Sequence, residues 1–116
     1  MTVINLMQRQ IEHRAELLCQ NRNKGLPVGI GKCCYEPVKN GVQFIKHHYK
    51  LDSSHSDYST LVARIIWDEP LKSWCLNVPH EKEGEWIPYP FLSQSDDLTA
   101  IIREIEKDPK SMFWNR

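Results

Sequence analysis

Two stretches of the chain carry apolar residues at intervals of three and four, the spacing that places side chains on one face of a helix. The first stretch contains Ile4, Met7, Ile11, Ala15 and Leu18. The second contains Leu98, Ile101, Ile102 and Ile105. These patterns predict helices over residues 3–21 and 96–107. Ser95 is the predicted cap of the second helix, and Asp108-Pro109 is expected to end it.

Between these helices, short apolar runs are separated by turn residues, a pattern typical of β-strands. The runs predict five strands, at Lys32–Glu36, Val42–Lys50, Thr60–Trp67, Ser73–Val78 and Glu85–Tyr89. Asn40-Gly41 is predicted to form the two-residue turn of the first hairpin. Pro37 has no N–H to donate, so the first strand is expected to lie at an edge or to be bulged. The polar residues 51–58 are predicted to form a loop.

The predicted order of elements is α-β-β-β-β-β-α. It favours an α+β fold, in which an antiparallel sheet of four to five strands is flanked by an N-terminal and a C-terminal helix. Both faces of the Thr60–Trp67 strand are largely apolar, which is typical of a central strand or of a strand with a helix on one face. The chain of 116 residues is expected to form a single domain, 1–116. The apolar tail Met112-Phe113-Trp114 is expected to pack back on the sheet.

Fifteen basic and fifteen acidic residues give a formal net charge of zero, which argues against a bulk electrostatic grip on nucleic acid or an anionic membrane. One local basic strip departs from this balance. Its candidate anion- or nucleic-acid-binding residues are Arg22, Lys24, Lys32, Lys46 and Lys50. Tyr35, Phe44 and Tyr49 are interleaved with the strip, and aromatic residues on a sheet can stack on bases. The alternative is that these residues are simply those of a half-exposed strand.

The first hairpin also suggests a metal or thiol site. With Asn40 and Gly41 in the turn, Cys34 is expected opposite His47, and Cys33 opposite His48. A directly opposed Cys–His pair can supply two zinc ligands or activate a thiolate. His55, in the adjacent polar loop, is the candidate third zinc ligand. Against this, the two pairs lie on opposite faces of the strand, and ordinary cross-strand packing explains the same residues.

The remaining sequence motifs argue against several known kinds of functional site. The glycine-rich residues 25–32 lack the spacing of a phosphate-binding P-loop and are expected to connect a helix to a strand. No G-x-S-x-G, H-E-x-x-H or EF-hand pattern occurs, so no catalytic residue and no cofactor is nominated. No signal peptide and no membrane-spanning run are visible. The four cysteines have no disulfide-framework spacing, and they are expected to be reduced thiols in a cytoplasm.

The second half of the chain resembles a family of short bacterial proteins, domain of unknown function 3024. The resemblance covers residues 59–116, and its most specific element is the closing pattern of Asp108-Pro109 followed by Phe113-Trp114. The chain departs from the family pattern at Cys75 and Asn77 and in its Asn115-Arg116 ending. The resemblance implies a cytoplasmic, bacterial, single-domain protein. It assigns no catalytic residues, because the family has no established activity.

These observations favour a small cytoplasmic binding or adaptor module without catalytic activity. Its expected partner is another protein or a second copy of the chain, and not a membrane. One alternative is a metal- or thiol-dependent protein that uses the Cys34/His47 hairpin. The other is a nucleic-acid-binding module that uses the basic strip from Arg22 to Lys50.

Overall fold

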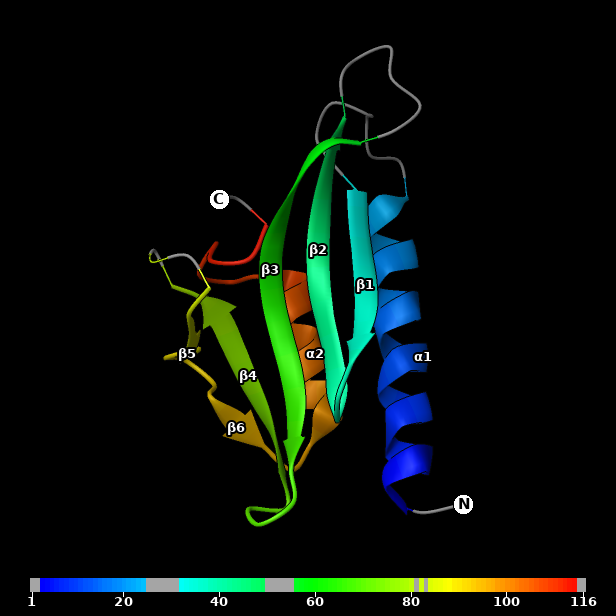
Figure 1. Ribbon diagram of the computed structural model, residues 1–116, viewed down its shortest axis with the longest axis vertical. Coiled ribbons are helices and arrows are strands. Elements are labelled where there is room, and N and C mark those ends of the chain that lie inside the picture. Colours follow the sequence, from blue (N-terminus) through cyan, green and yellow to red (C-terminus); the bar gives the residue numbers. More distant parts are fainter. Residues whose placement is uncertain (1–2, 25–31, 50–55, 81, 83, 115–116) are drawn as a thin grey trace.

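A computed structural model of the chain describes residues 3–24, 32–49, 56–80, 82 and 84–114. Two helices flank an antiparallel sheet, and the predicted α+β class is confirmed (Figure 1). The helices are α1 (Val3–Asn23) and α2 (Leu98–Lys107). The strands are β1 (Lys32–Val38), β2 (Gly41–Tyr49), β3 (Ser56–Asp68), β4 (Ser73–Pro79), β5 (Trp86–Pro88) and β6 (Gln94–Ser95).

The sheet follows the chain from one edge to the other, in the order β1-β2-β3-β4-β5. The two-residue strand β6 pairs with the first part of β4, on the same edge that β5 occupies further along. The edge position of β1 and the central position of β3 confirm two of the predictions. The predicted loop over residues 51–58 is wrong for its last three residues, because β3 begins at Ser56; residues 51–55 lie outside the described part.

Helix α2 begins two residues later than the sequence pattern predicts, and its cap is Asp97 rather than Ser95. The Asp97 carboxylate accepts the backbone N–H of Thr99 at 3.0 Å. The Ser95 hydroxyl instead accepts the backbone N–H of Asp97 at 3.0 Å. Both residues therefore act at this end of the helix, and the charged side chain takes the capping position, where an anion is stabilised by the helix dipole.

The predicted register of the first hairpin is wrong by two positions. Lys39 and Asn40 form the turn, and Asn40 adopts the positive φ of 64° that the turn requires. Gly41 lies in β2, opposite Val38. A Cβ atom at Gly41 would stand 1.8 Å from the backbone oxygen of Ile65, so the approach of β3 demands a glycine there. Gly41, which the sequence pattern assigns to a turn, is needed for strand packing.

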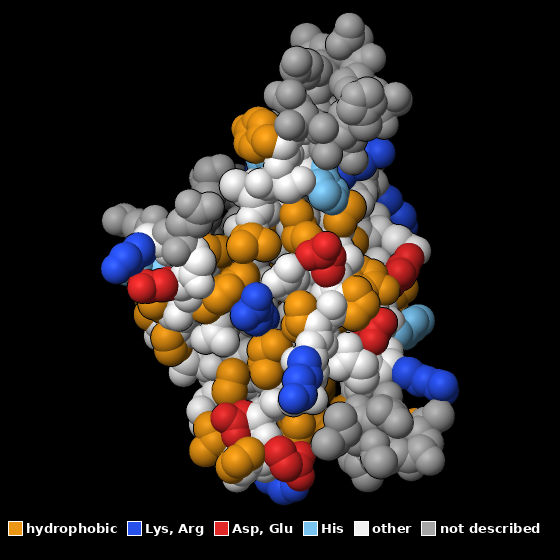
Figure 2. All heavy atoms as spheres, viewed as in Figure 1, with side chains coloured by type: hydrophobic (Ala, Val, Ile, Leu, Met, Phe, Trp, Pro, Cys, Tyr) orange, Lys and Arg blue, Asp and Glu red, His pale blue; other side chains and the backbone are white. Residues whose placement is uncertain are grey.

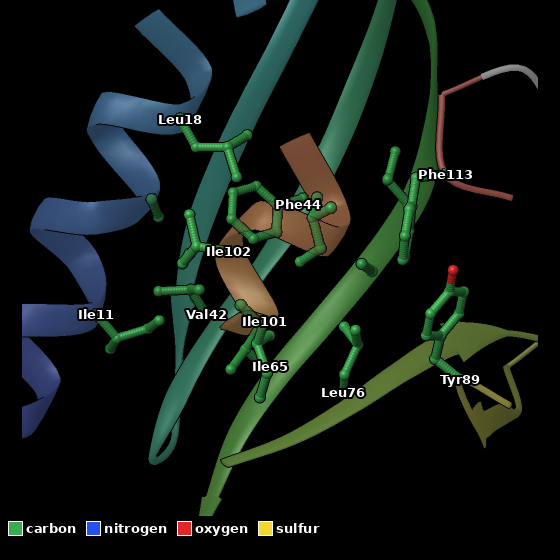
Figure 3. Close-up of a cluster of buried hydrophobic side chains, with 14 of the residues drawn as sticks. Ile11, Leu18, Val42, Phe44, Ile65, Leu76, Tyr89, Ile101, Ile102 and Phe113 are labelled. Carbon is green, nitrogen blue, oxygen red and sulfur yellow. The ribbon is translucent and has the colours of Figure 1, made fainter. Parts of the chain in front are cut away.

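The hydrophobic core lies between one face of the sheet and the two helices. Figure 3 shows Ile11 and Leu18 of α1 and Ile101 of α2 directed toward Phe44 and Ile65 of the sheet. All five side chains are buried. Both helices thus bury their apolar stripes on the same side of the sheet, as their spacing predicted.

The C-terminal tail is held by Asp108, the residue that follows α2. Its carboxylate accepts the backbone N–H groups of Met112, Phe113 and Trp114 at 2.8, 3.2 and 3.1 Å. The Trp114 indole N–H donates to the backbone oxygen of Ile105 at 2.8 Å. Phe113 and Trp114 are buried, which confirms that the tail packs back. Within the described part of the chain, neither helix has the length and apolar character needed to cross a bilayer.

Candidate binding surface and buried thiol pair

The face of the sheet opposite the helices is open. In Figure 1 the strands lie in front of α2 with no helix over them, and Figure 2 shows hydrophobic side chains gathered across the middle of this face. Strand residues alternate between the two faces. Phe44, Ile65 and Leu76 point into the core, so their neighbours Gln43, Arg64 and Cys75 point to the open face.

A row of side chains crosses the open face in register. Cross-strand pairing runs from Glu36 to Gln43, Arg64, Asn77 and Pro88. The Gln43 amide connects two charges of opposite sign. Its nitrogen donates to Glu36 Oε1 at 2.7 Å, and its oxygen accepts from Arg64 Nη2 at 3.0 Å. The Arg64 guanidinium is therefore held in a defined orientation without a direct ion pair to Glu36.

Arg64 is the distinctive group of this row. Its guanidinium carbon lies 4.2 Å from the ring centroid of Trp86, a cation–π contact. Its Nε is buried and has no hydrogen-bond partner. Among the described residues, it is the one buried side-chain nitrogen or oxygen without such a partner. A guanidinium presents donors in a fixed fork that matches a carboxylate or phosphate. Because Nε is closed to solvent, an anionic oxygen of a ligand would receive its hydrogen bonds from the outer nitrogens of the half-buried guanidinium.

Apolar side chains share the open face with Arg64. They include Ile45, which is buried, Ile66, which is half-buried, and Leu61, which is 42% exposed. Trp86 adds an indole ring. An apolar surface around an oriented charge is typical of a binding site rather than of a solvated sheet face.

The residues of the predicted basic strip are divided among different environments. The Arg22 guanidinium lies 4.3 Å from the Trp114 ring, and Lys46 Nζ donates to the Trp114 backbone oxygen at 2.8 Å. These two cations hold the C-terminal tail, and burial lowers the pKa of Arg22. Lys24 and Lys32 are exposed, and Lys50 lies outside the described residues. Of the interleaved aromatic side chains, Phe44 is fully buried in the core.

The predicted Cys–His pairs are not formed. Cys34 lies opposite Ile45 and Cys33 opposite Lys46, while His47 lies opposite Lys32 in β1. His47 Nδ1 lies 2.6 Å from the Ser59 hydroxyl on the other neighbouring strand. His48 Nε2 lies 2.7 Å from the Thr60 hydroxyl. His55, the third candidate ligand, lies outside the described residues. The cause is the position of the hairpin turn, which lies one residue earlier than predicted. A turn one residue earlier moves the partner of each β1 residue by two positions.

A different pair of sulfur atoms is brought together instead. Cys19 Sγ of α1 lies 2.6 Å from Cys33 Sγ of β1, and both residues are buried. An open groove of about 260 Å³ adjoins them and is also lined by Cys34. The hydrogen bond to Cys19 and burial raise the pKa of the Cys33 thiol, and burial raises the pKa of Cys34. Such surroundings are the opposite of the electropositive sites that activate catalytic cysteines.

Sequence reasoning missed both features for different reasons. Arg64 stands alone as a charge inside the apolar run Leu61–Trp67, a signal that could have marked it. The approach of Cys19 to Cys33 has no comparable signal, because it depends on how α1 lies against the edge strand.

Comparison with protein families identifies a family to which the chain is similar. A family model described as Domain of unknown function (DUF3024) matches residues 3–115. The match extends the resemblance of residues 59–116 over nearly the whole chain. No curated protein and no solved structure matches the chain.

Proposed function

The chain belongs to the DUF3024 family, a domain of unknown function, and from its open sheet face we propose that it is a small cytoplasmic binding module without catalytic activity. Its ligand is a protein that places a carboxylate on Arg64. The observation that carries this proposal is the half-buried Arg64 guanidinium, which Gln43 and Trp86 hold in a fixed orientation on the open face.

The surroundings of Arg64 support a protein ligand. A partner that covers Leu61 and Ile66 would bury apolar area, which is the main source of affinity in protein association. Burial would also remove water from around the guanidinium and strengthen a hydrogen bond to a carboxylate. Arg and Trp are the residue types that most often dominate the binding energy of an interface.

Nucleic acid is supported less well than protein. Phosphate binding rests on several cations acting together, and the net charge of the chain is zero. Arg22 and Lys46, two cations of the basic strip, already contact Trp114. Arg64, a cation of the open face, is linked through Gln43 to the acidic Glu36.

A nuclear magnetic resonance titration tests the anion site directly. Sodium acetate is the carboxylate probe, and the Nε–H signals of Arg64 and the exposed Arg9 are followed together with the Trp86 indole signal. The Arg64 and Trp86 signals are expected to shift and to approach saturation, while the Arg9 signal shifts little. A uniform response of both arginines would reject a specific site at Arg64.

Two further experiments identify the class of ligand. Proteins captured from a cell lysate by the wild type are compared with those captured by Arg64→Met and by the control Arg9→Met. A protein retained by the control, lost with Arg64→Met and bound by the purified wild type supports the proposal. A single-stranded oligonucleotide is titrated at two salt concentrations in parallel. Tight binding that weakens steeply with salt would favour the nucleic-acid alternative and reject this one.

A further inference from the structure

The sulfur atoms of Cys19 and Cys33 lie closer than a simple contact allows. Their separation is 2.6 Å. Two carbon atoms in non-bonded contact are roughly 3.5–4.0 Å apart, and sulfur is larger than carbon. A disulfide bond measures about 2.05 Å. The two thiols are thus placed much nearer to the bonded than to the non-bonded arrangement.

The backbone around Cys33 is fixed to the same helix that carries Cys19. Asn23, the last residue of α1, donates from its amide nitrogen to the backbone oxygen of Cys33 at 2.9 Å. The amide oxygen of Asn23 accepts the backbone N–H of Cys33 at 2.7 Å. These two bonds occupy the outer edge of β1 at this residue, as a neighbouring strand would. The position of Cys33 relative to α1 is therefore set by contacts other than its own sulfur.

We propose that Cys19 and Cys33 are a redox-active pair that forms a reversible disulfide with low-molecular-weight disulfides as the oxidant. The bond would connect α1 to the edge strand β1. It goes beyond the binding module proposed above, because Cys33 and Arg64 point to opposite faces of the sheet.

The reaction is a two-step thiol–disulfide exchange. The thiolate of one cysteine attacks a sulfur of the small disulfide, and the S–S bond breaks to leave a mixed disulfide and one small thiolate. The second cysteine loses its proton and attacks the protein sulfur of the mixed disulfide, which releases the second small thiolate. Two electrons and two protons pass from the protein pair to the small disulfide, which becomes two thiols.

The groove of about 260 Å³ provides a route for a small oxidant, since Cys19 and Cys33 both line it. The other two cysteines serve as controls. Cys34 lies in the same groove but points to the open face, opposite Ile45. Cys75 lies in β4 and pairs with Ile66 and Gln94. Neither is expected to replace a member of the pair.

The first test uses the double variant Cys34→Ser/Cys75→Ser, which retains only the proposed pair. The folded variant is incubated with 2-hydroxyethyl disulfide at mildly alkaline pH, where more of each thiol is ionised. The expected product is a monomer that has lost two hydrogens, a mass decrease of about 2 Da. Peptide mapping is expected to join the tryptic peptide of Cys19 to that of Cys33. Two free thiols remaining after prolonged incubation, or a stable mixed disulfide, would overturn the proposal.

The second test asks whether folding favours the bond. The disulfide equilibrium of the same variant is measured against a thiol–disulfide buffer, in the folded state and in concentrated guanidinium chloride. The closed loop runs from residue 19 to residue 33, and its closure is expected to be favoured roughly 100-fold by folding. The oxidised protein is expected to melt roughly 10 °C higher than the reduced protein. Equal equilibrium constants in the two states would show that the folded structure does not favour the disulfide between Cys19 and Cys33.

Discussion

The carboxylate of Asp108 accepts the backbone N–H of Trp114 at 3.1 Å, six residues further along the chain. The same carboxylate accepts the N–H groups of Met112 and Phe113. Asp108 itself adopts a left-handed conformation with a φ of 45° at the end of α2. The Asp-Pro and Phe-Trp pairs carry the family resemblance. They therefore belong to one structural arrangement, in which the Asp108 side chain binds the backbone of the C-terminal tail.

Replacement of Asp108 by alanine is expected to destabilise the protein by about 2–3 kcal/mol, because three backbone donors lose a charged acceptor. Denaturant unfolding measures the change. Asp96→Ala is the matched control, since Asp96 is exposed beside α2, and its effect is expected to stay within about 0.5 kcal/mol. Equal effects of the two substitutions would show that the tail is held by its apolar side chains alone.

Replacement of Gly41 by alanine is expected to cost more than about 3 kcal/mol. The new Cβ atom would stand 1.8 Å from the backbone oxygen of Ile65, so β2 and β3 would have to separate locally. Gly84→Ala is the control, because no other described residue beyond its chain neighbours has an atom within 4 Å of its Cβ position, although its φ is +85°. That control is expected to lose only about 1–2 kcal/mol through backbone strain. Similar losses for both variants would contradict the close approach at Gly41.

Tyr89 is expected to make the protein sensitive to alkaline pH. Burial and a hydrogen bond to Glu104, at 2.8 Å, raise the pKa of the Tyr89 hydroxyl above its ordinary value of 10.0. Above pH 10 the folded state therefore keeps a proton that the unfolded state loses, so the free energy of unfolding falls as pH rises. Below that pH the contribution of Tyr89 is fully present.

Thermal unfolding measured between pH 8 and pH 11, near and above the tyrosine pKa, checks this expectation. Tyr89→Phe is expected to lose about 1 kcal/mol at neutral pH, because Glu104 loses a donor. Its stability is then expected to fall less steeply than that of the wild type above pH 10. Parallel pH profiles would show that the Tyr89 hydroxyl contributes nothing to alkaline unfolding.

Arg64→Met is expected to leave stability within about 1 kcal/mol of the wild type, or to raise it, while abolishing the response to carboxylates. A half-buried cation with an unsatisfied donor contributes little to folding, and an apolar chain of similar length fills the same space. Chemical denaturation and the acetate titration are measured on the same sample. A loss of more than about 2 kcal/mol would mark Arg64 as a structural residue and remove the basis of the proposed binding site.

Periodicity alone was sufficient to locate the helices and most strands. The three-and-four spacing of Ile101, Ile102 and Ile105 predicted the face that α2 buries, because that face follows directly from helix geometry. The apolar character of both faces of β3 predicted its central position. Pro37 similarly indicated an edge strand, since it cannot donate to a neighbour.

The contacts of the candidate-site residues could not be predicted in the same way, because their neighbours come from other elements. Asn40-Gly41 has the local signature of a two-residue turn, yet the contact between Gly41 and Ile65 requires the glycine one position inside the strand. That shift of two positions in pairing separates Cys34 from His47. Register depends on the packing of β2 against β3, which is a long-range interaction.

The order and character of the elements follow from hydrophobic spacing along the chain, because that spacing reports which side of each element is buried. Which side chains come into contact follows from the three-dimensional packing of those elements. That packing places Arg64 beside Trp86 across three strands, and Cys19 beside Cys33 between a helix and a strand. Such contacts depend on the relative placement of elements, which is set by the packing of the whole core and not by any local pattern.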